Sequence, residues 1–211
     1  MINRNQIVQV VLDSSESLLV RQMTLLACTG GKSQIFQDQQ ERNKRRLIDN
    51  AVGQAGELAI NILAFQERDF GKTMYINSRN KANANPHLGD DGMDILDTHI
   101  DVKTSMIRSS SRSQDMLSYN LVVRPQEFKE GWVYVLGLIY QKEITDPKIV
   151  VNIIGWAHSD DFPDEIETQG LFKNTFPLRA SNLNPLPLPD YLWSSNLRPH
   201  IKKNSEKVLT F

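Results

Sequence analysis

The sequence predicts an α/β fold in which helices flank a mixed central β-sheet, preceded by a helical N-terminal segment. Apolar residues recur at spacings of three and four from Leu47 to Ile62, which is typical of an amphipathic helix, and a less regular pattern over residues 5–28 also favours a helix. Short runs rich in β-branched and aromatic residues follow, which is typical of strands. Helices followed by strands indicate a sheet covered by helices.

The length of 211 residues and the hydrophobic content of 40% are sufficient for a buried core and favour a single domain over residues 1–211. Within it we expect a helical segment over 1–40, a core over 47–157 and a C-terminal extension over 158–211.

Two helices are predicted before the sheet, over residues 5–28 and 35–66. The second has one apolar face, formed by Leu47, Ile48, Ala51, Val52, Ala55, Leu58, Ala59 and Ile62. A polar row runs along the same helix through Asn50, Gln54, Glu57 and Asn61. Gly53 and Gly56 each cost a helix about 1 kcal/mol relative to alanine, which indicates a packing or functional reason for them.

Strands are predicted after residue 73. Met74–Ile76 is a short candidate, and Gly92–Leu96 with His99–Lys103 has the pattern of a tight hairpin. Three further strands are expected over residues 119–123, 132–140 and 149–156, and the longer of these runs are apolar on both faces, as in central strands.

Composition limits the class of protein. The single cysteine, Cys28, excludes an internal disulfide and a cysteine-based zinc cluster, and favours a reducing, cytoplasmic location. No secretory signal and no membrane span are expected. The net charge of −1 argues against a protein that coats nucleic acid non-specifically, although acidic and basic clusters both occur.

The predicted hairpin brings acidic residues together. With Asp97-Thr98 as its turn, Asp94 faces Asp101, and Lys103 shares their face. Opposed residues have Cβ atoms about 5 Å apart, and two carboxylates at that distance repel each other unless a cation neutralises them. Oxygen ligands without a thiolate favour Mg²⁺, for which Mn²⁺ would substitute. The Lys103 ammonium could hold a water or a phosphate, neutralise developing charge, or act as a base if its pKa falls.

Asp94 and Asp101-Val102-Lys103 resemble the PD-(D/E)xK motif of the restriction-endonuclease-like nuclease superfamily, with Met93 at the position of the proline and a short gap between the aspartates. The resemblance covers residues 47–157. It implies that this is the catalytic core, that Asp94, Asp101 and the Val102 carbonyl hold Mg²⁺, and that Lys103 positions or activates water. Glu57 resembles the family's upstream helical glutamate and would assist a water or a second metal.

The resemblance implies a DNA endonuclease of restriction or mobile-element type. Cutting both strands of a duplex would require two sites, so a homodimer is the simplest assembly. The alternatives are a structure-selective nuclease for junctions or flaps, a partner-regulated nuclease, and a DNA-binding protein with the fold but no activity.

Each candidate residue also has an alternative interpretation. Asp94 and Asp101 could lie on a solvated edge hairpin, and Glu57 could belong to the wet side of an amphipathic helix. Arg108 and Arg112, which flank a serine-rich stretch, are candidates for phosphate contacts, or could belong to a plain surface loop.

Overall fold

Four strands form one mixed sheet at the centre of the chain. The computed structural model describes residues 2–29, 40–84, 94–95, 98–107, 115–193 and 197. The strand order is β1-β5-β4-β2, in which β2 runs parallel to β4 and the other two pairs are antiparallel. The α/β class and the mixed central sheet are therefore as predicted. The strands are β1 (Val8–Leu12), β2 (Ile100–Ile107), β4 (Val133–Tyr140) and β5 (Ile149–His158).

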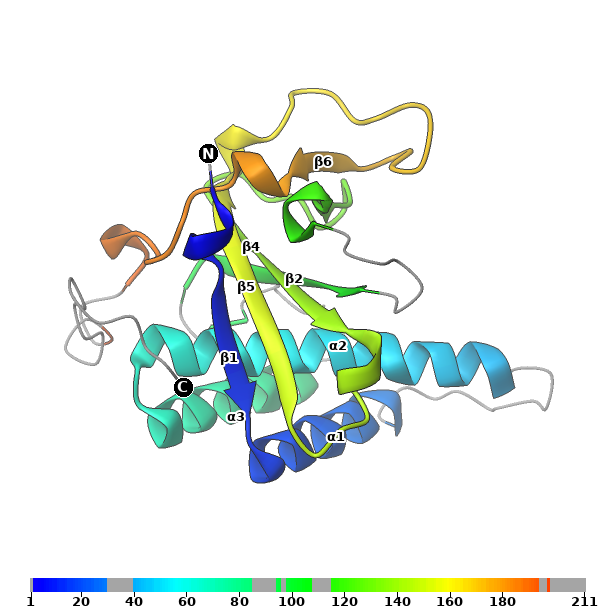
Figure 1. The fold of residues 1–211 in the computed structure, drawn as a ribbon, viewed down its shortest axis with the longest axis vertical. Coiled ribbons are helices and arrows are strands. Elements are labelled where there is room, and N and C mark those ends of the chain that lie inside the picture. The colour runs from blue at the N-terminus through cyan, green and yellow to red at the C-terminus, as the bar shows by residue number, and fades with distance from the viewer. Residues whose placement is uncertain are drawn as a thin grey trace.

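Three helices cover one face of this sheet (Figure 1): α1 (Ser14–Thr29), α2 (Gln40–Phe65) and α3 (Arg68–Ala84). α2 crosses the sheet and lies between the other two helices. Its apolar face is buried as predicted, because Val52, Ala55, Leu58, Ala59 and Ile62 all belong to the core cluster shared by helices and sheet. The predicted helix over 35–66 is confirmed from residue 40, and residues 30–39 lie outside the described part of the chain.

The other face of the sheet carries a second apolar cluster, which is covered by a two-stranded antiparallel sheet, β3 (Asn120–Val123) with β6 (Phe176–Arg179), and by connecting segments. The described helices therefore lie on one face and do not enclose the sheet from both sides. The predicted strands over 119–123, 132–140 and 149–156 are confirmed as β3, β4 and β5. Short 3-10 helices connect the elements: η1 (Arg4–Gln6), η3 (Met116–Ser118), η4 (Gln141–Glu143), η5 (Ser159–Asp161), η6 (Ala180–Asn182) and η7 (Asp190–Leu192).

The expectation of an entirely helical N-terminal segment is wrong, because β1 precedes α1 and pairs with β5. The run Val8–Leu12 is rich in β-branched residues, which favour a strand. Asp13 then starts the helix, since its carboxylate accepts hydrogen bonds from the amides of Ser15 (2.8 Å) and Glu16 (2.9 Å). The Glu16 carboxylate accepts one from the Asp13 amide in return, which completes a capping box.

The predicted strand at Met74–Ile76 is also wrong, because these residues lie inside α3. A short apolar run is compatible with either a strand or a buried helix, and its tertiary contacts decide between them. A Cβ atom added at Gly71 would lie 2.7 Å from the backbone Cα of Ile62, so glycine lets α3 approach α2 closely. Tyr75, Ser78 and Arg79 face α2 and are buried.

No helix within the described residues is both long enough and apolar enough to cross a membrane.

Candidate functional site

β2 presents different chemistry on its two faces. Thr104 packs against Gly56 of α2, so Ile100, Val102 and Thr104 face the helices. Side chains alternate along a strand, so Asp101 and Lys103 share the opposite face, as the sequence predicts. The Nζ atom of Lys103 lies 2.9 Å from Asp101 Oδ2 and 3.1 Å from Glu127 Oε2.

Asp94 reaches the exposed edge of the same strand from the turn that precedes it. Its amide donates to the carbonyl of Ile100 (3.0 Å), and its Oδ2 accepts from the amide of Val102 (2.6 Å). The side chain is 5% exposed, and Asp101 is 6% exposed. Asp94 and Ile95 form a bend and not the predicted strand, while Gly92, Met93 and Leu96 lie outside the described residues. The two aspartates therefore meet beside β2, although they are not held by two paired strands.

Val102 also presents its backbone to this edge. The N–H and C=O groups of one strand residue point to the same side. Because the Val102 amide donates to Asp94, the Val102 carbonyl faces the same edge, away from β4. This orientation is the one that the predicted metal ligand requires.

Glu57 lies on the part of α2 that faces α3, and it is 8% exposed. The polar row of α2 is buried from Gln54 through Glu57 to Asn61, so its interpretation as a solvated face is wrong. Gln54 Nε2 donates to Glu57 Oε1 (3.2 Å), and Tyr75 of α3 donates its hydroxyl proton to Gln54 Oε1 (2.7 Å). Asn61 Nδ2 donates to the backbone carbonyls of Glu57 and Asp94, both at 2.8 Å, and so ties α2 to the turn before β2.

Arg79 joins Glu57 to Asp94. Its Nε lies 3.0 Å from Glu57 Oε2, and its Nη2 lies 3.0 Å from Asp94 Oδ1. The arginine is 8% exposed. The sequence analysis missed Arg79, Gln54, Asn61 and Tyr75 as parts of the site. The available signal was Tyr75, Ser78 and Arg79 at spacings of three and four, which mark one face of a helix facing the polar row of α2.

The negative charges of the buried carboxylates repel one another. Burial raises the pKa of Asp94 well above its usual range, and the charges of Glu57 and Asp101 raise it further, while Arg79 and the Val102 amide act in the opposite direction. For Lys103, burial lowers the pKa, but Asp101 and Glu127 raise it more, so the net pKa lies above the ordinary value. Lys103 is thus a charged ammonium at neutral pH, which favours its electrostatic roles over the role of a base.

The oxygen atoms of the site are ligands of the kind that a hard divalent cation prefers. Glu57, Asp94 and Asp101 offer buried carboxylate oxygens, and the carbonyl of Val102 adds another oxygen. The repulsion that raises the Asp94 pKa is what a divalent cation relieves. Within the described residues, no three Asp, Glu, His or Cys side chains lie close enough to hold a metal as they stand. Arg79 is the group that bridges two of the three carboxylates.

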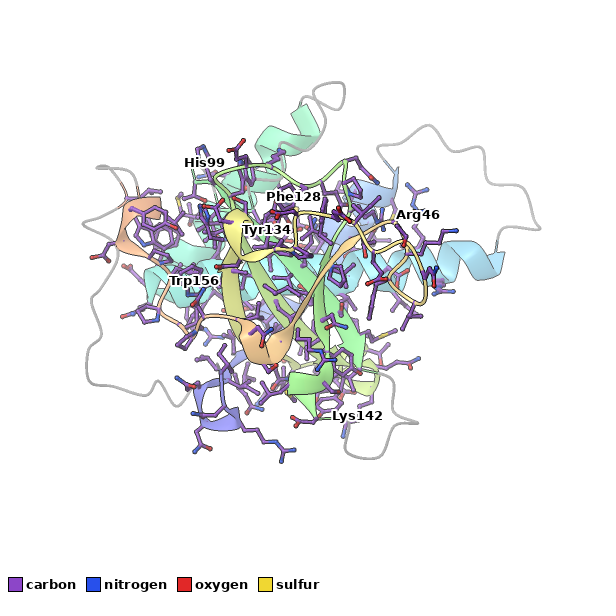
Figure 2. The ribbon with its side chains drawn as sticks, turned by 90° about the horizontal axis from the view of Figure 1, so that it is seen from above. Arg46, His99, Phe128, Tyr134, Lys142 and Trp156 are labelled. Atoms are coloured by element: carbon purple, nitrogen blue, oxygen red, sulfur yellow. The ribbon has the colours of Figure 1, made fainter. Side chains whose placement is uncertain are left out.

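Aromatic rings lie near Asp101 and Lys103, and Figure 2 labels two of these residues, Phe128 and Tyr134. Tyr134 pairs in register with Asp101, and its ring stacks on Phe128 with centroids 6.0 Å apart. The ring of His99, the residue before β2, stacks on the ring of Trp132 with centroids 5.4 Å apart. The candidate phosphate contacts Arg108 and Arg112 lie outside the described residues, so they stay predictions.

Comparison of the chain with protein-family models, with curated proteins and with solved structures finds no match. The resemblance to PD-(D/E)xK nucleases therefore stays a hypothesis that is argued from the site itself.

Proposed function

We propose that this chain is a metal-dependent nuclease of the PD-(D/E)xK type that hydrolyses phosphodiester bonds in DNA. One observation carries the proposal. Asp94, from the turn before β2, is joined by Arg79 to Glu57 of α2, and it lies near enough to Asp101 of β2 for the Asp101 charge to raise its pKa, while Lys103 pairs with Asp101. Burying three carboxylates in one region of the fold, with Asp94 between the other two, costs free energy, so this arrangement favours a functional origin.

Asp94, Asp101 and the carbonyl of Val102 would hold Mg²⁺, or Mn²⁺ in its place, and Glu57 would assist a water or a second ion. The metal supplies Lewis acidity towards a phosphate oxygen and lowers the pKa of a bound water. Lys103 contributes its charged ammonium, which Asp101 and Glu127 hold beside the carboxylates, to neutralise negative charge that develops on the phosphoryl group.

The substrate we propose is double-stranded DNA, and the role is that of an endonuclease of restriction or mobile-element type. Cleavage of both strands requires two active sites, so the proposed assembly is a homodimer.

The test is cleavage of supercoiled plasmid by the purified chain with Mg²⁺, and again with EDTA. We expect nicked and linear products with Mg²⁺ only. Asp101→Ala and Lys103→Ala should each lower the rate at least about 100-fold, in line with the loss of one charge-stabilising group. The matched controls Asp146→Ala and Lys142→Ala should retain the wild-type rate, since both residues are exposed and come after the end of β4. Tyr134, which pairs with Asp101, lies near the start of β4, and Figure 2 labels both Tyr134 and Lys142.

Each alternative predicts a different outcome of this experiment. Cleavage that persists in EDTA, or wild-type rates in both site variants, would refute the proposed site. Preferential cutting of four-way junctions or flaps would favour a structure-selective nuclease. DNA binding without cleavage, at any concentration of Mg²⁺ or Mn²⁺, would favour a binding protein that has the fold but lacks activity.

A further inference from the structure

Arg79 places one guanidinium between two carboxylates that come from distant parts of the chain. Its Nε and Nη2 atoms each lie 3.0 Å from an oxygen, of Glu57 on one side and of Asp94 on the other. All three residues are buried, with at most 8% of their surface exposed. A guanidinium does not lose its proton in proteins, so this buried positive charge is permanent.

The two carboxylates also accept other hydrogen bonds. Gln54 Nε2 donates to Glu57 Oε1 at 3.2 Å and lies 3.4 Å from Oε2, and the Val102 amide donates to Asp94 Oδ2 at 2.6 Å. The oxygens in contact with Arg79, Glu57 Oε2 and Asp94 Oδ1, are the ones that a cation shared by the two carboxylates would also contact. A guanidinium and a divalent cation in contact with the same oxygens repel each other.

We infer that Arg79 is a positioning residue that holds Glu57 and Asp94 together in the metal-free protein, and that a divalent metal must displace its guanidinium from Asp94 in order to bind. The inference rests on the proposed function, because it takes Asp94 as a metal ligand. In this arrangement the guanidinium keeps the carboxylates in place and lowers the affinity of the site for metal.

Metal affinity separates this role from an ordinary structural one. Loss of an arginine that only supports the fold loosens the site, so metal binding weakens or stays the same. Loss of a competing cation makes metal binding tighter. The two accounts thus predict opposite signs for the same variant.

The experiment is calorimetric titration of the full chain with MnCl₂, for the wild type, Arg79→Met and Arg79→Lys. We expect Arg79→Met to lower the Kd for Mn²⁺ at least tenfold. Arg79→Lys keeps the charge but loses the planar fork that spans two carboxylates, so its Kd should fall by a smaller factor, about threefold. The thermal midpoint of Arg79→Met should lie below that of the wild type in EDTA and rise more on saturation with Mn²⁺.

Arg68→Met is the matched control. Arg68 forms an ion pair with the fully buried Glu16, and its Nε lies 2.9 Å from Glu16 Oε1, at the contact between α3 and α1. Its loss should lower the thermal midpoint and leave the Kd for Mn²⁺ within twofold of the wild-type value. An equal gain in affinity for Arg68→Met would overturn the inference, because general loosening would then explain both variants.

The outcomes also separate this inference from the proposed function. Wild-type protein that binds Mn²⁺, with Arg79→Met binding equally or more weakly, overturns the inference and leaves the nuclease proposal standing. If Arg79→Met does not fold, Arg79→Lys replaces it as the deciding variant: a lower Kd for Mn²⁺ than that of the wild type supports the inference, and an equal or higher Kd overturns it. Absence of Mn²⁺ binding in the wild type and in both Arg79 variants overturns the inference together with the metal-dependent function.

Discussion

Gly56 lies where α2 meets β2, and replacing it with alanine tests whether this contact sets the position of Glu57. A Cβ atom at residue 56 would lie 2.9 Å from Thr104 Cβ and 3.2 Å from Thr104 Cγ2, and closer still to Thr104 Oγ1. These distances leave no room for a methyl group, so α2 must move away from β2. Gly53, one turn earlier in α2, has no atom within 4 Å of its added Cβ and provides the matched control.

The magnitude follows from the difference between the two variants. Each alanine gains about 1 kcal/mol of helix propensity, and this gain cancels in the comparison. What remains is the overpacking at residue 56, which costs about 1–3 kcal/mol. We therefore expect Gly56→Ala to have a free energy of unfolding about 1–3 kcal/mol below that of Gly53→Ala, or a thermal midpoint about 2–12 °C lower.

The assays are urea denaturation in EDTA and plasmid cleavage at a temperature at which both variants are folded. Displacement of Glu57 by a fraction of an ångström should slow cleavage at least about 10-fold in Gly56→Ala, while Gly53→Ala stays near the wild-type rate. Adding Thr104→Ala to Gly56→Ala should restore part of the stability, since it removes Oγ1 and Cγ2. Equal stability of the two glycine variants would refute the close approach of α2 and β2 on which the site geometry depends.

Two further predictions concern the N-terminus of α1 and the hydrogen bonds behind Glu57. Asp13→Ala should cost about 1 kcal/mol at neutral pH through loss of the helix cap. Hydrogen bonds from the Glu16 amide and the Ser15 hydroxyl hold the pKa of Asp13 below its ordinary value of 3.8, so the stabilisation by the Asp13 cap is present above that pH and is lost as the pH falls through the lowered pKa. In urea titrations, the difference in free energy of unfolding between the wild type and Asp13→Ala should be smaller at pH 2.5 than at pH 7. A difference that is the same at both pH values would contradict the assignment. Tyr75→Phe leaves the buried Gln54 Oε1 without its hydroxyl donor and should cost about 1–3 kcal/mol in thermal denaturation. It should also slow plasmid cleavage, because Gln54 in turn supports Glu57, whereas Tyr191→Phe, at an exposed tyrosine, should change neither quantity.

The parts of the site that the sequence predicted correctly depend on local geometry. Side chains alternate along any strand, so Asp101 and Lys103 had to share a face once β2 was identified. The period of α2 likewise placed Gln54, Glu57 and Asn61 in one row. Neither pattern specifies which element packs against these side chains. The sequence pattern of the polar row of α2 was therefore equally compatible with exposure to solvent and with burial against α3.

The sequence-based errors at β1 and α3 share a physical cause. Val8–Leu12 and Met74–Ile76 are short, mainly apolar runs. The β-branched residues of Val8–Leu12 favour a strand, but in runs this short such preferences are small, and the packing partner decides between helix and strand. β5 supplies that partner for β1, and α2 supplies it for α3 through the close approach at Gly71.

A buried polar row nevertheless restricts what can pack against it. Polar side chains inside a protein need hydrogen-bond partners, and a buried carboxylate needs a charged one. Glu57, if buried, therefore requires a cation from a neighbouring element, and an arginine on a helix satisfies that need in a way that an apolar strand at Met74–Ile76 does not. The helical position of Arg79 and the burial of Glu57 therefore depend on each other: the positive charge of Arg79 on α3 allows the polar row of α2, with Glu57 in it, to lie inside the fold, near the carboxylate of Asp94 in the turn before β2.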